Sequence, residues 1–353
     1  MSLRILTIGL SASFLFILSD TARAEAGPTD PLYQSHDLIE IRIEAPLTTL
    51  MRERPDEEEL DGKLSYVDEA GETTVLDLKL RTRGKYRRQE RICPFAPIRL
   101  NVKRKQVEDT LLDEQDKFKL VTHCRNSGRY EQAALREYLV YRMFNELTDL
   151  SYRVRLLHIT WVDIERNNRE TIRYGFVIED RERFAIRTGL EVSELERTSV
   201  DSLDGSYNNL VSVFEYFAGN TDYSPIAGAR DEPCCHNTHL YANGDTGFVA
   251  IPYDFDMSGL VDAPYATPNV RFQLRSVRER LYRGRCLYND QIPDTLEKFN
   301  AKKATFYEYV NSYPRLNSSS RMGMRSFLDS FFKTIENPNA VESKLAGACV
   351  GPR

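Results

Sequence analysis

Apolar and charged residues alternate along several short segments in the first half of the chain. Ile39, Ile41 and Ile43 are separated by charged residues, and this two-residue period predicts a strand with one buried face. Further apolar runs predict strands over residues 75–82, 98–102, 118–121, 156–162 and 172–178. The acidic segment 51–63 is expected to be loop-like, and the leader 25–36, which contains Gly27, Pro28 and Pro31, is expected to be flexible.

Other segments repeat their apolar residues at three- and four-residue spacing, which is the spacing of one helix face. Leu135, Leu139 and Met143 follow this pattern within residues 130–147, which are therefore predicted to be helical. The same periodicity predicts helices over residues 206–217, 270–283, 293–312 and 321–336. Strands that come first and helices that come later, with a strand pair between them, favour an α+β fold.

The first 24 residues have the features of a secretory signal peptide. Arg4 precedes an apolar run over residues 5–18, and Ala22-Arg23-Ala24 is a cleavage site of the A-x-A type. The run is shorter than the roughly 20 apolar residues that span a membrane, and no later segment is apolar enough to do so. We therefore expect an exported protein, periplasmic or secreted, with no transmembrane segment after cleavage.

Charge and cysteine content narrow the choice of partners and compartment. The formal net charge is −5, and a mildly acidic protein is a poor candidate for nucleic-acid binding. An even number of cysteines in an exported chain predicts disulfides. The candidates are Cys93, Cys124, Cys234, Cys235, Cys286 and Cys349. We expect Cys93 to pair with Cys124, because each adjoins a predicted strand of one local unit, and the adjacent Cys234 and Cys235 to join Cys286 and Cys349.

Two carboxylates, Asp254 and Asp256, follow the apolar run 247–251. A strand that continues through them would point both side chains to one side, where they would suit a hard cation such as Mg²⁺. Asn237 could add an amide oxygen to the same metal. The alternatives are that the pair caps a turn or begins a helix, or that it holds a purely structural Ca²⁺.

Asp222 is a candidate general base. It follows the predicted helix 206–217 by a few residues and is the only acid in the loop that closes that helix. An Asp placed near an acceptor hydroxyl orients it and takes its proton in phosphoryl transfer. A helix, a polar loop with one Asp, a strand pair and then Asp254-Phe255-Asp256 is the order of parts in kinase-like sites.

A basic loop and a clefted arginine are candidates for binding the phosphates of a nucleotide. Arg83, Gly84 and Lys85 end a predicted strand, and glycine lets backbone N–H groups approach an anion closely. Arg99 lies among apolar residues and needs an anionic partner, either a phosphate or the carboxylate of Glu179. Glu179 itself is either a nucleotide-site residue or a helix-start carboxylate.

Adjacent cysteines followed by two histidines also admit a zinc site. Cys234, Cys235, His236 and His239 are of the residue types that bind zinc, although their spacing fits no ordinary zinc-finger pattern. Adjacent cysteines in an exported chain are more often disulfide partners, so zinc is the less favoured interpretation.

Taken in order, several short motifs resemble the spore coat protein H (CotH) kinase-like family, especially its exported bacterial branch, over residues 37–266. The motifs are Arg83-Gly84-Lys85, Pro97-Ile98-Arg99-Leu100, Arg136-Glu137-Tyr138-Leu139, Gly175-Phe176-Val177-Ile178-Glu179, Asn220-Thr221-Asp222 and Tyr253-Asp254-Phe255-Asp256. The family's Arg-Gly-Asn is Arg-Gly-Lys in this chain, and Arg99 lies nearest to the expected nucleotide-binding lysine.

The resemblance implies an atypical protein-kinase-like fold that binds ATP and Mg²⁺ or Mn²⁺. Its N-terminal lobe, residues 37–179, would be an antiparallel sheet-rich nucleotide-binding lobe, and residues 180–353 a helical lobe with the catalytic and metal loops. Asp222 would be catalytic and Asp254 would bind the metal. The function implied is a phosphotransferase acting on a hydroxyl of a protein or of the cell envelope. The alternative is a non-catalytic exported module for binding or envelope structure.

Overall fold

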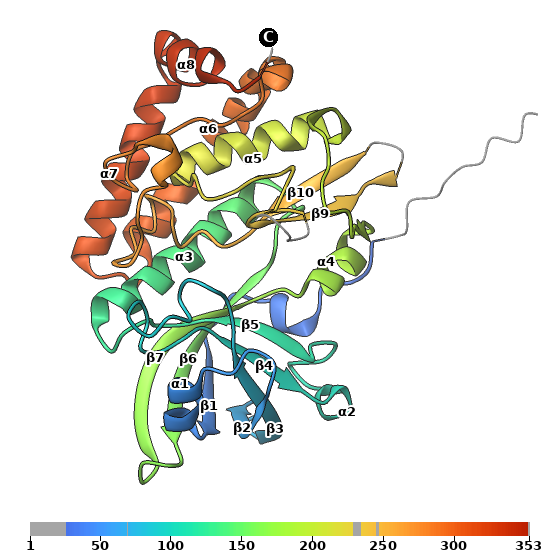
Figure 1. Cartoon of the computed structure of the whole chain (residues 1–353), viewed down its shortest axis with the longest axis vertical. Helices are drawn as coiled ribbons and strands as arrows, with labels where there is room; N and C mark the ends of the chain where they lie inside the picture. Colours follow the sequence, from blue (N-terminus) through green and yellow to red (C-terminus); the bar gives the residue numbers. More distant parts are fainter. Residues whose placement is uncertain (1–25, 69, 229–233, 245–246, 352–353) are drawn as a thin grey trace, which may run out of the picture.

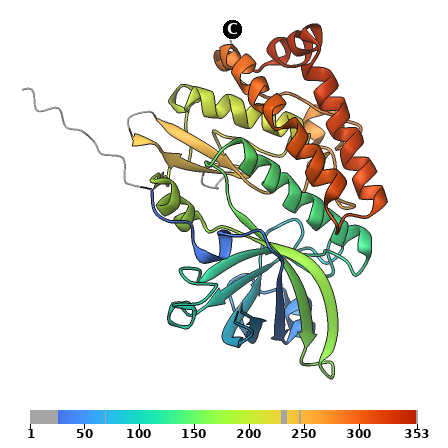
Figure 2. The same cartoon turned by 180° about the vertical axis from the view of Figure 1, so that it is seen from behind.

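The computed structural model describes residues 26–68, 70–228, 234–244 and 247–351 (Figure 1). The predicted signal peptide, residues 1–24, lies outside these residues. A β-barrel built from the first half of the chain occupies one end of the molecule, and most of the helices occupy the other (Figures 1 and 2).

Seven strands close the barrel in the order β1-β2-β3-β4-β5-β7-β6. The barrel strands are β1 (Ile39–Ala45), β2 (Leu60–Val67), β3 (Thr73–Thr82), β4 (Ile98–Val102), β5 (Lys117–Val121), β6 (Val154–Asp163) and β7 (Arg169–Ile178). The neighbours pair antiparallel except β1 and β6, which are parallel, with Ile41 opposite Ile159. The alternate residues that point inward are apolar, and they form a core that includes Ile43, Leu80 and Trp161.

The closed barrel shows that the predicted fold is wrong. The sequence predicted the antiparallel sheet-rich lobe and helical lobe of a kinase-like fold, whereas the sheet is mixed and has no open edge. The parallel pairing of β1 with β6 closes it, and closure gives each strand two hydrogen-bonded neighbours. Alternation within one segment reveals a strand but does not reveal which distant strand it pairs with.

The remaining elements are helices, short 3₁₀ turns and a second sheet of three strands. The helices are α1 (Leu47–Glu53), α2 (Arg104–Val107), α3 (Gly128–Leu147), α4 (Arg181–Thr188), α5 (Gly205–Ala218), α6 (Ile292–Ser312), α7 (Ser318–Ile335) and α8 (Pro338–Lys344). Short 3₁₀ turns are η1 (Pro31–Tyr33), η2 (Val200–Ser202), η4 (Val270–Phe272), η5 (Cys286–Gln291) and η6 (Ala346–Ala348). The small sheet has the order β10-β9-β8, from β8 (Glu191–Val192), β9 (Thr238–Ala242) and β10 (Phe248–Pro252).

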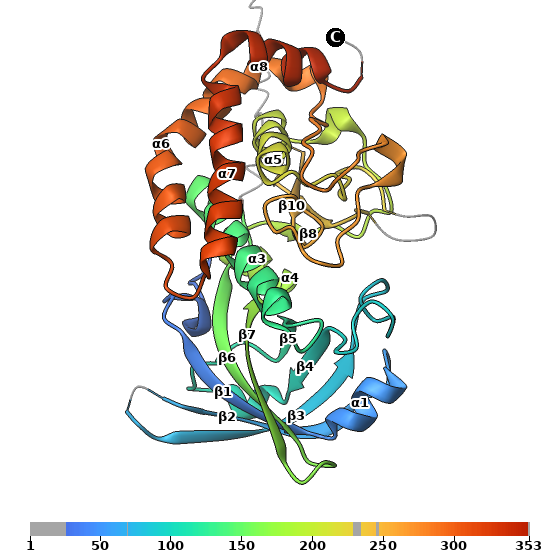
Figure 3. The same cartoon turned by 90° about the vertical axis from the view of Figure 1, so that its left-hand side faces the viewer.

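Helix α3 lies between the barrel and the other helices (Figure 3). It packs on β6 and β7 on one side and on α6 and α7 on the other. Phe144 on this helix packs against Phe214 of α5, and Tyr141 packs edge-on against Phe255, in the turn after β10. The helix thus fixes the β10 turn relative to the barrel.

Two local predictions are wrong. Residues 270–283 form only the short turn η4 instead of a helix, and Arg280 in this segment donates to the carbonyls of Phe217 and Phe327. The segment 51–63 contains the end of α1 and the start of β2. The leader is anchored, since Leu32 and Tyr33 in η1 are buried. No helix in the described ranges is both long and apolar enough to cross a bilayer.

The six cysteines form three disulfides. Cys93 and Cys124 are bonded, with their Cα atoms 4.6 Å apart, so the predicted pair is confirmed. The other expected pairing is wrong, because Cys234 bonds to Cys235 and Cys286 bonds to Cys349. The disulfides are compatible with an exported protein.

Candidate active site

The turn after β10 brings two carboxylates to one buried arginine. Asp256 Oδ2 lies 3.0 Å from Arg87 Nε, and Asp254 Oδ1 lies 4.0 Å from Arg87 Nη2. The strand ends at Pro252 and Asp254 has a φ of 63°, so the carboxylates converge because the chain turns and not, as predicted, because a strand alternates. The turn is fixed from α3, where the Tyr141 hydroxyl accepts a hydrogen bond of 2.7 Å from the Asp254 amide.

A third acid, Glu137 on α3, is buried against this pair. Its side chain is almost inaccessible, and its Oε1 has no hydrogen-bond partner in the described part of the chain. Burial, and then the charge of Asp256, raise the pKa of Glu137 well above its ordinary value. Burial, and then the charge of Asp254, raise the pKa of Asp256 to about 7. Three acids therefore crowd around Arg87, and a further cation would favour their ionised forms.

Cations from the barrel face these acids. Arg83 lies in the loop after β3. Burial, and then the charge of Arg87, lower the pKa of Arg83, whereas the charges of Asp254 and Glu137 raise it. Lys119 on β5 lies with its Nζ 4.9 Å from the centre of the Tyr253 ring. Burial, and then the charge of Arg83, lower the pKa of Lys119 to about 8.

Three cations lie in a row across the outer face of the barrel. Arg81 on β3 is opposite Arg99 on β4, which is opposite Lys119 on β5. Like charges that face each other destabilise a sheet. Glu59 lies 3.9 Å from Arg81, but no acid of the described residues forms an ion pair with Arg99 or Lys119. These two cations are therefore available to an anionic ligand.

Arg99 and Lys119 line a cavity of about 500 Å³ between the barrel and α4. Arg181 and His239 line the same cavity, and its lining also contains other cations and four acids: Arg104, Lys117, Arg183, Glu114, Asp116, Asp180 and Glu182. His239 stacks on Tyr253, whose neighbour in the chain is Asp254, so the cavity adjoins the carboxylate turn. Its cations are well placed to hold an anion beside Asp254.

The loop after α5 places Asp222 next to Asn237 and His236. Asp222 Oδ1 lies 2.9 Å from His236 Nε2, and Asn237 Nδ2 donates to Asp222 Oδ2 at 3.2 Å. The Asn237 carbonyl in turn accepts a hydrogen bond of 3.0 Å from the Tyr253 amide. Asp222, Asn237 and Asp254 are therefore parts of one connected site, although they are distant in the sequence.

The other predicted residues divide into those near the site and those used elsewhere. Gly84 has a φ of 78°, which glycine adopts without strain, and Lys85 beside it is exposed. Glu179 is buried and forms two contacts with Arg187, at 2.7 and 3.0 Å, so it pairs with neither Arg99 nor a ligand. We therefore leave Glu179 out of the proposed site.

The structure gives no support to the zinc alternative in the residues it describes. Cys234 and Cys235 are bonded to each other in a disulfide. His236 contacts Asp222, and His239 Nδ1 lies 2.5 Å from the Tyr152 hydroxyl. No group of three or more His, Cys, Asp or Glu side chains in the described ranges is arranged to hold a metal ion.

Three residues of the site were not predicted from the sequence, and only one of them carried a usable signal. Lys119 alternates with Phe118 and Leu120, and this pattern places it on the barrel face opposite the core. Glu137 belongs to the motif Arg136-Glu137-Tyr138-Leu139 but lies off the apolar stripe of its helix, so nothing in the sequence marked it as buried. Arg87 is one of several arginines in a basic loop, and the sequence does not distinguish it from the others.

No protein-family model matches the chain, and no curated protein matches its sequence. The resemblance to the CotH kinase-like family therefore stays a prediction, and the function is argued from the site.

Proposed function

We propose that this protein is an ATP- and Mg²⁺-dependent phosphotransferase that acts on a hydroxyl of a protein or of the cell envelope. The observation that carries the proposal is a chain of contacts through Tyr253, the neighbour of Asp254: Lys119 Nζ lies 4.9 Å from its ring centre, and its amide donates to the carbonyl of Asn237, whose side chain donates to Asp222. Phosphoryl transfer needs cations for the phosphates, carboxylates for a metal and a base for the acceptor.

The cations would bind the phosphates. Arg99 and Lys119 line the cavity beside Asp254 and form no ion pair with an acid of the described residues. Arg83 is within electrostatic range of Lys119 and also of Asp254 and Glu137. A chain of phosphates along this line would relieve the repulsion among the cations.

The carboxylates fit a magnesium ion that arrives with a nucleotide. Such an ion needs only one or two protein carboxylates, because phosphate oxygens and water complete its shell. Asp254, whose side chain is 32% exposed, is the accessible ligand, with Asp256 second and the amide oxygen of Asn237 third. The unpartnered Oε1 of Glu137 and the raised pKa of Asp256 indicate a site short of positive charge. When bound, Mg²⁺ neutralises charge on the phosphates.

Asp222 would hold and deprotonate the acceptor. The acceptor oxygen gives its proton to the Asp222 carboxylate and forms the new bond to the γ-phosphorus, while the bond from that phosphorus to the β–γ bridging oxygen breaks and ADP leaves. His236 and Asn237 keep the carboxylate in place through the contacts at 2.9 and 3.2 Å. A positioned general base contributes about 10²–10⁴ in rate.

The second candidate is a binding module without catalysis. Arg87 favours it, because this arginine already pairs with Asp256 and lies 4.0 Å from Asp254, so the acids are partly neutralised without any ligand.

Transfer from radiolabelled ATP to the protein itself and to envelope extracts, with Mg²⁺ or Mn²⁺, tests the proposal. We expect label transfer by the wild type, a loss of about 10²-fold or more in Asp222→Asn, and nearly unchanged ATP affinity in that variant. Asp201→Asn, an exposed acid on η2, is the matched control and should keep the activity. ATP binding without transfer would favour the binding module, and absence of both would refute the proposal.

A further inference from the structure

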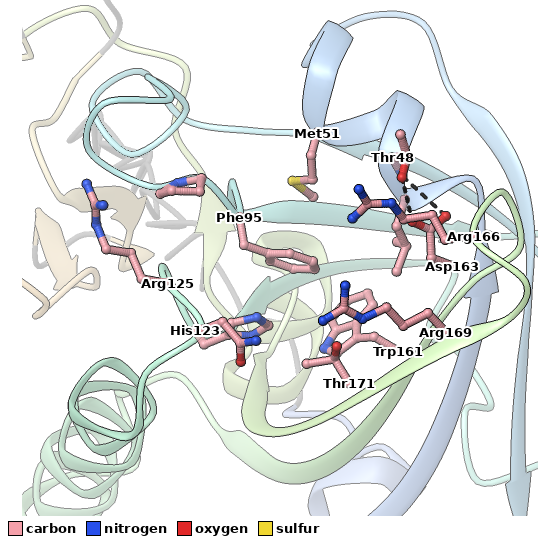
Figure 4. A pocket seen from close by; sticks show the side chains of 13 residues that line it. Thr48, Met51, Phe95, His123, Arg125, Trp161, Asp163, Arg166, Arg169 and Thr171 are labelled. Carbon is pink, nitrogen blue, oxygen red and sulfur yellow. Dashed lines mark hydrogen bonds between the residues drawn. The ribbon is translucent and has the colours of Figure 1, made fainter.

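A second cavity, of about 280 Å³, lies between α1, the loop after Cys93 and the turn from β6 to β7 (Figure 4). It shares no lining residue with the cavity of Arg99 and Lys119. Much of its lining is apolar, with side chains of Leu47, Met51, Pro94, Phe95 and Trp161. This lining suits an apolar ring or chain of a ligand.

Aromatic rings form the centre of the lining. The Phe95 ring stacks on His123 with centroids 4.4 Å apart and meets Trp161 edge-on at 5.0 Å. Phe95 is only half-buried, so part of its ring is open to the cavity. Trp161 is buried, and its Nε1 has no hydrogen-bond partner among the described residues. A buried donor without an acceptor is costly, and a ligand oxygen that reached it would relieve that cost.

Arginines give the cavity a positive charge. Arg125, Arg166 and Arg169 line it, and Figure 4 shows Arg166 and Arg169 across the Phe95 ring from Arg125 in that view. The one acid among the described lining residues, Asp163, is already engaged, because Thr48 donates to it from Oγ1 at 2.6 Å and from its amide at 3.3 Å. Arg166 and Arg169 form no ion pair with the described residues.

The aromatic wall is held in place from two sides. The Cys93–Cys124 disulfide joins the loop that carries Phe95 to the loop that carries His123, and the Phe95 amide donates to the Cys124 carbonyl at 3.1 Å. Arg54, at the end of α1, donates to the Pro94 carbonyl at 2.9 Å. A wall fixed in this way loses little conformational freedom when a ligand binds.

We propose that this cavity binds a small aromatic oxyanion, a single ring that carries a carboxylate or a phosphate. The ring packs against Phe95 and Trp161, and the forks of Arg166 and Arg169 hold the oxyanion, since planar guanidinium groups match both carboxylate and phosphate oxygens.

The fluorescence of Trp161 tests the proposal directly, because it is the only tryptophan in the chain. The protein is titrated with phenylacetate and with phenyl phosphate, which separates the two oxyanions. Acetate and inorganic phosphate supply the charge without the ring, and benzyl alcohol supplies the ring without the charge. We expect a saturable change in emission with at least one ring oxyanion, at an affinity about tenfold tighter than for its controls.

Variants assign the binding to this cavity. The double variant Arg166→Gln, Arg169→Gln should weaken binding about tenfold, and Arg325→Gln, an exposed arginine on α7, should leave it unchanged. Arg166 and Arg169 are both exposed, so the double variant should keep its fold. Circular dichroism checks this. Calorimetry repeats the titrations independently of fluorescence. The proposal would be overturned if neither ring oxyanion bound more tightly than benzyl alcohol, if neither bound by both methods, or if the double variant bound as well as the wild type.

Discussion

Arg87 Nε lies 3.0 Å from Asp256 Oδ2, and both side chains are less than one-tenth exposed. Arg87 also donates to the Tyr265 hydroxyl at 3.1 Å, which fixes the direction of its guanidinium. Glu137 and Asp256 depend on the same cation, since its charge lowers their pKa values against the effect of burial, and Asp254 Oδ1 lies 4.0 Å from Arg87 Nη2. Arg87 is therefore the central cation of the carboxylate cluster.

Replacing Arg87 by Gln should destabilise the fold by about 3–5 kcal/mol, because it leaves buried carboxylates without a cation. Urea denaturation measures the change. Arg88→Gln is the control, since Arg88 pairs with the exposed Asp56, and it should cost less than about 1 kcal/mol. Adding Asp256→Asn to Arg87→Gln should restore part of the loss. A wild-type midpoint for Arg87→Gln, or no recovery in the double variant, would contradict this account.

Replacing Lys119 by Met should weaken ATP binding about tenfold or more, because it removes a partly buried cation from the cavity beside Asp254. Lys298→Met, an exposed lysine on α6 that does not line this cavity, is the control and should change affinity less than about threefold. The pKa of Lys119, lowered to about 8, adds a second readout. Its charge is lost as pH rises through 8, so wild-type affinity should fall between pH 7 and 9 more steeply than that of the variant. Parallel pH profiles would exclude Lys119 from the anion site.

Replacing Asp254 by Asn should abolish binding of Mg²⁺ or Mn²⁺ and leave the fold intact. Asn is the suitable substitution, because it tolerates the positive φ of 63° at this position better than Ala does. Calorimetry with Mn²⁺, with and without ATP, measures the affinity, and Asp290→Asn on the exposed side of η5 is the control. Unchanged affinity in Asp254→Asn would show that the metal assignment is wrong.

Local sequence patterns predicted most elements and failed where distant contacts decide the structure. Helix α3 begins within two residues of the prediction, because its stripe of apolar residues is long and regular. Strand β2 was missed, since Asp61, Gly62 and Lys63 hide the alternation of Leu64 and Tyr66. Barrel closure was missed because the parallel pairing of β1 with β6 has no local signal.

The candidate site was predicted in part for a similar reason. Asp222 was named from its loop after a helix, Asn237 from a polar run and Asp254 from a strand end, and the structure joins them through the Tyr253 amide and the Asn237 carbonyl. Glu179 was named as well, but its carboxylate is used by Arg187, from the following helix. A sequence shows which side chains can ionise, whereas only the fold shows which of them are already paired.

Glu215, on α5, provides a prediction that is independent of any ligand. It is completely buried, and burial raises the pKa of its carboxyl to about 8, against the opposing effects of the Asn220 amide and the Arg283 charge. The unfolded chain releases this proton near the ordinary value of 4.5. Between pH 4.5 and about pH 8 the native state therefore binds more protons than the unfolded state. The contribution of Glu215 to the free energy of unfolding falls as pH rises through this range.

Glu215→Gln removes this titration while keeping the shape of the neutral acid. The melting temperature of the variant should therefore rise relative to that of the wild type between pH 5 and pH 9, with most of the change complete by pH 8. Thermal denaturation at five or more pH values measures it. Glu342→Gln, an exposed glutamate on α8, is the control and should show no such trend. A difference that stays constant with pH would mean that Glu215 is ionised in the native protein across this range, and that a cation or a conformational change compensates its burial.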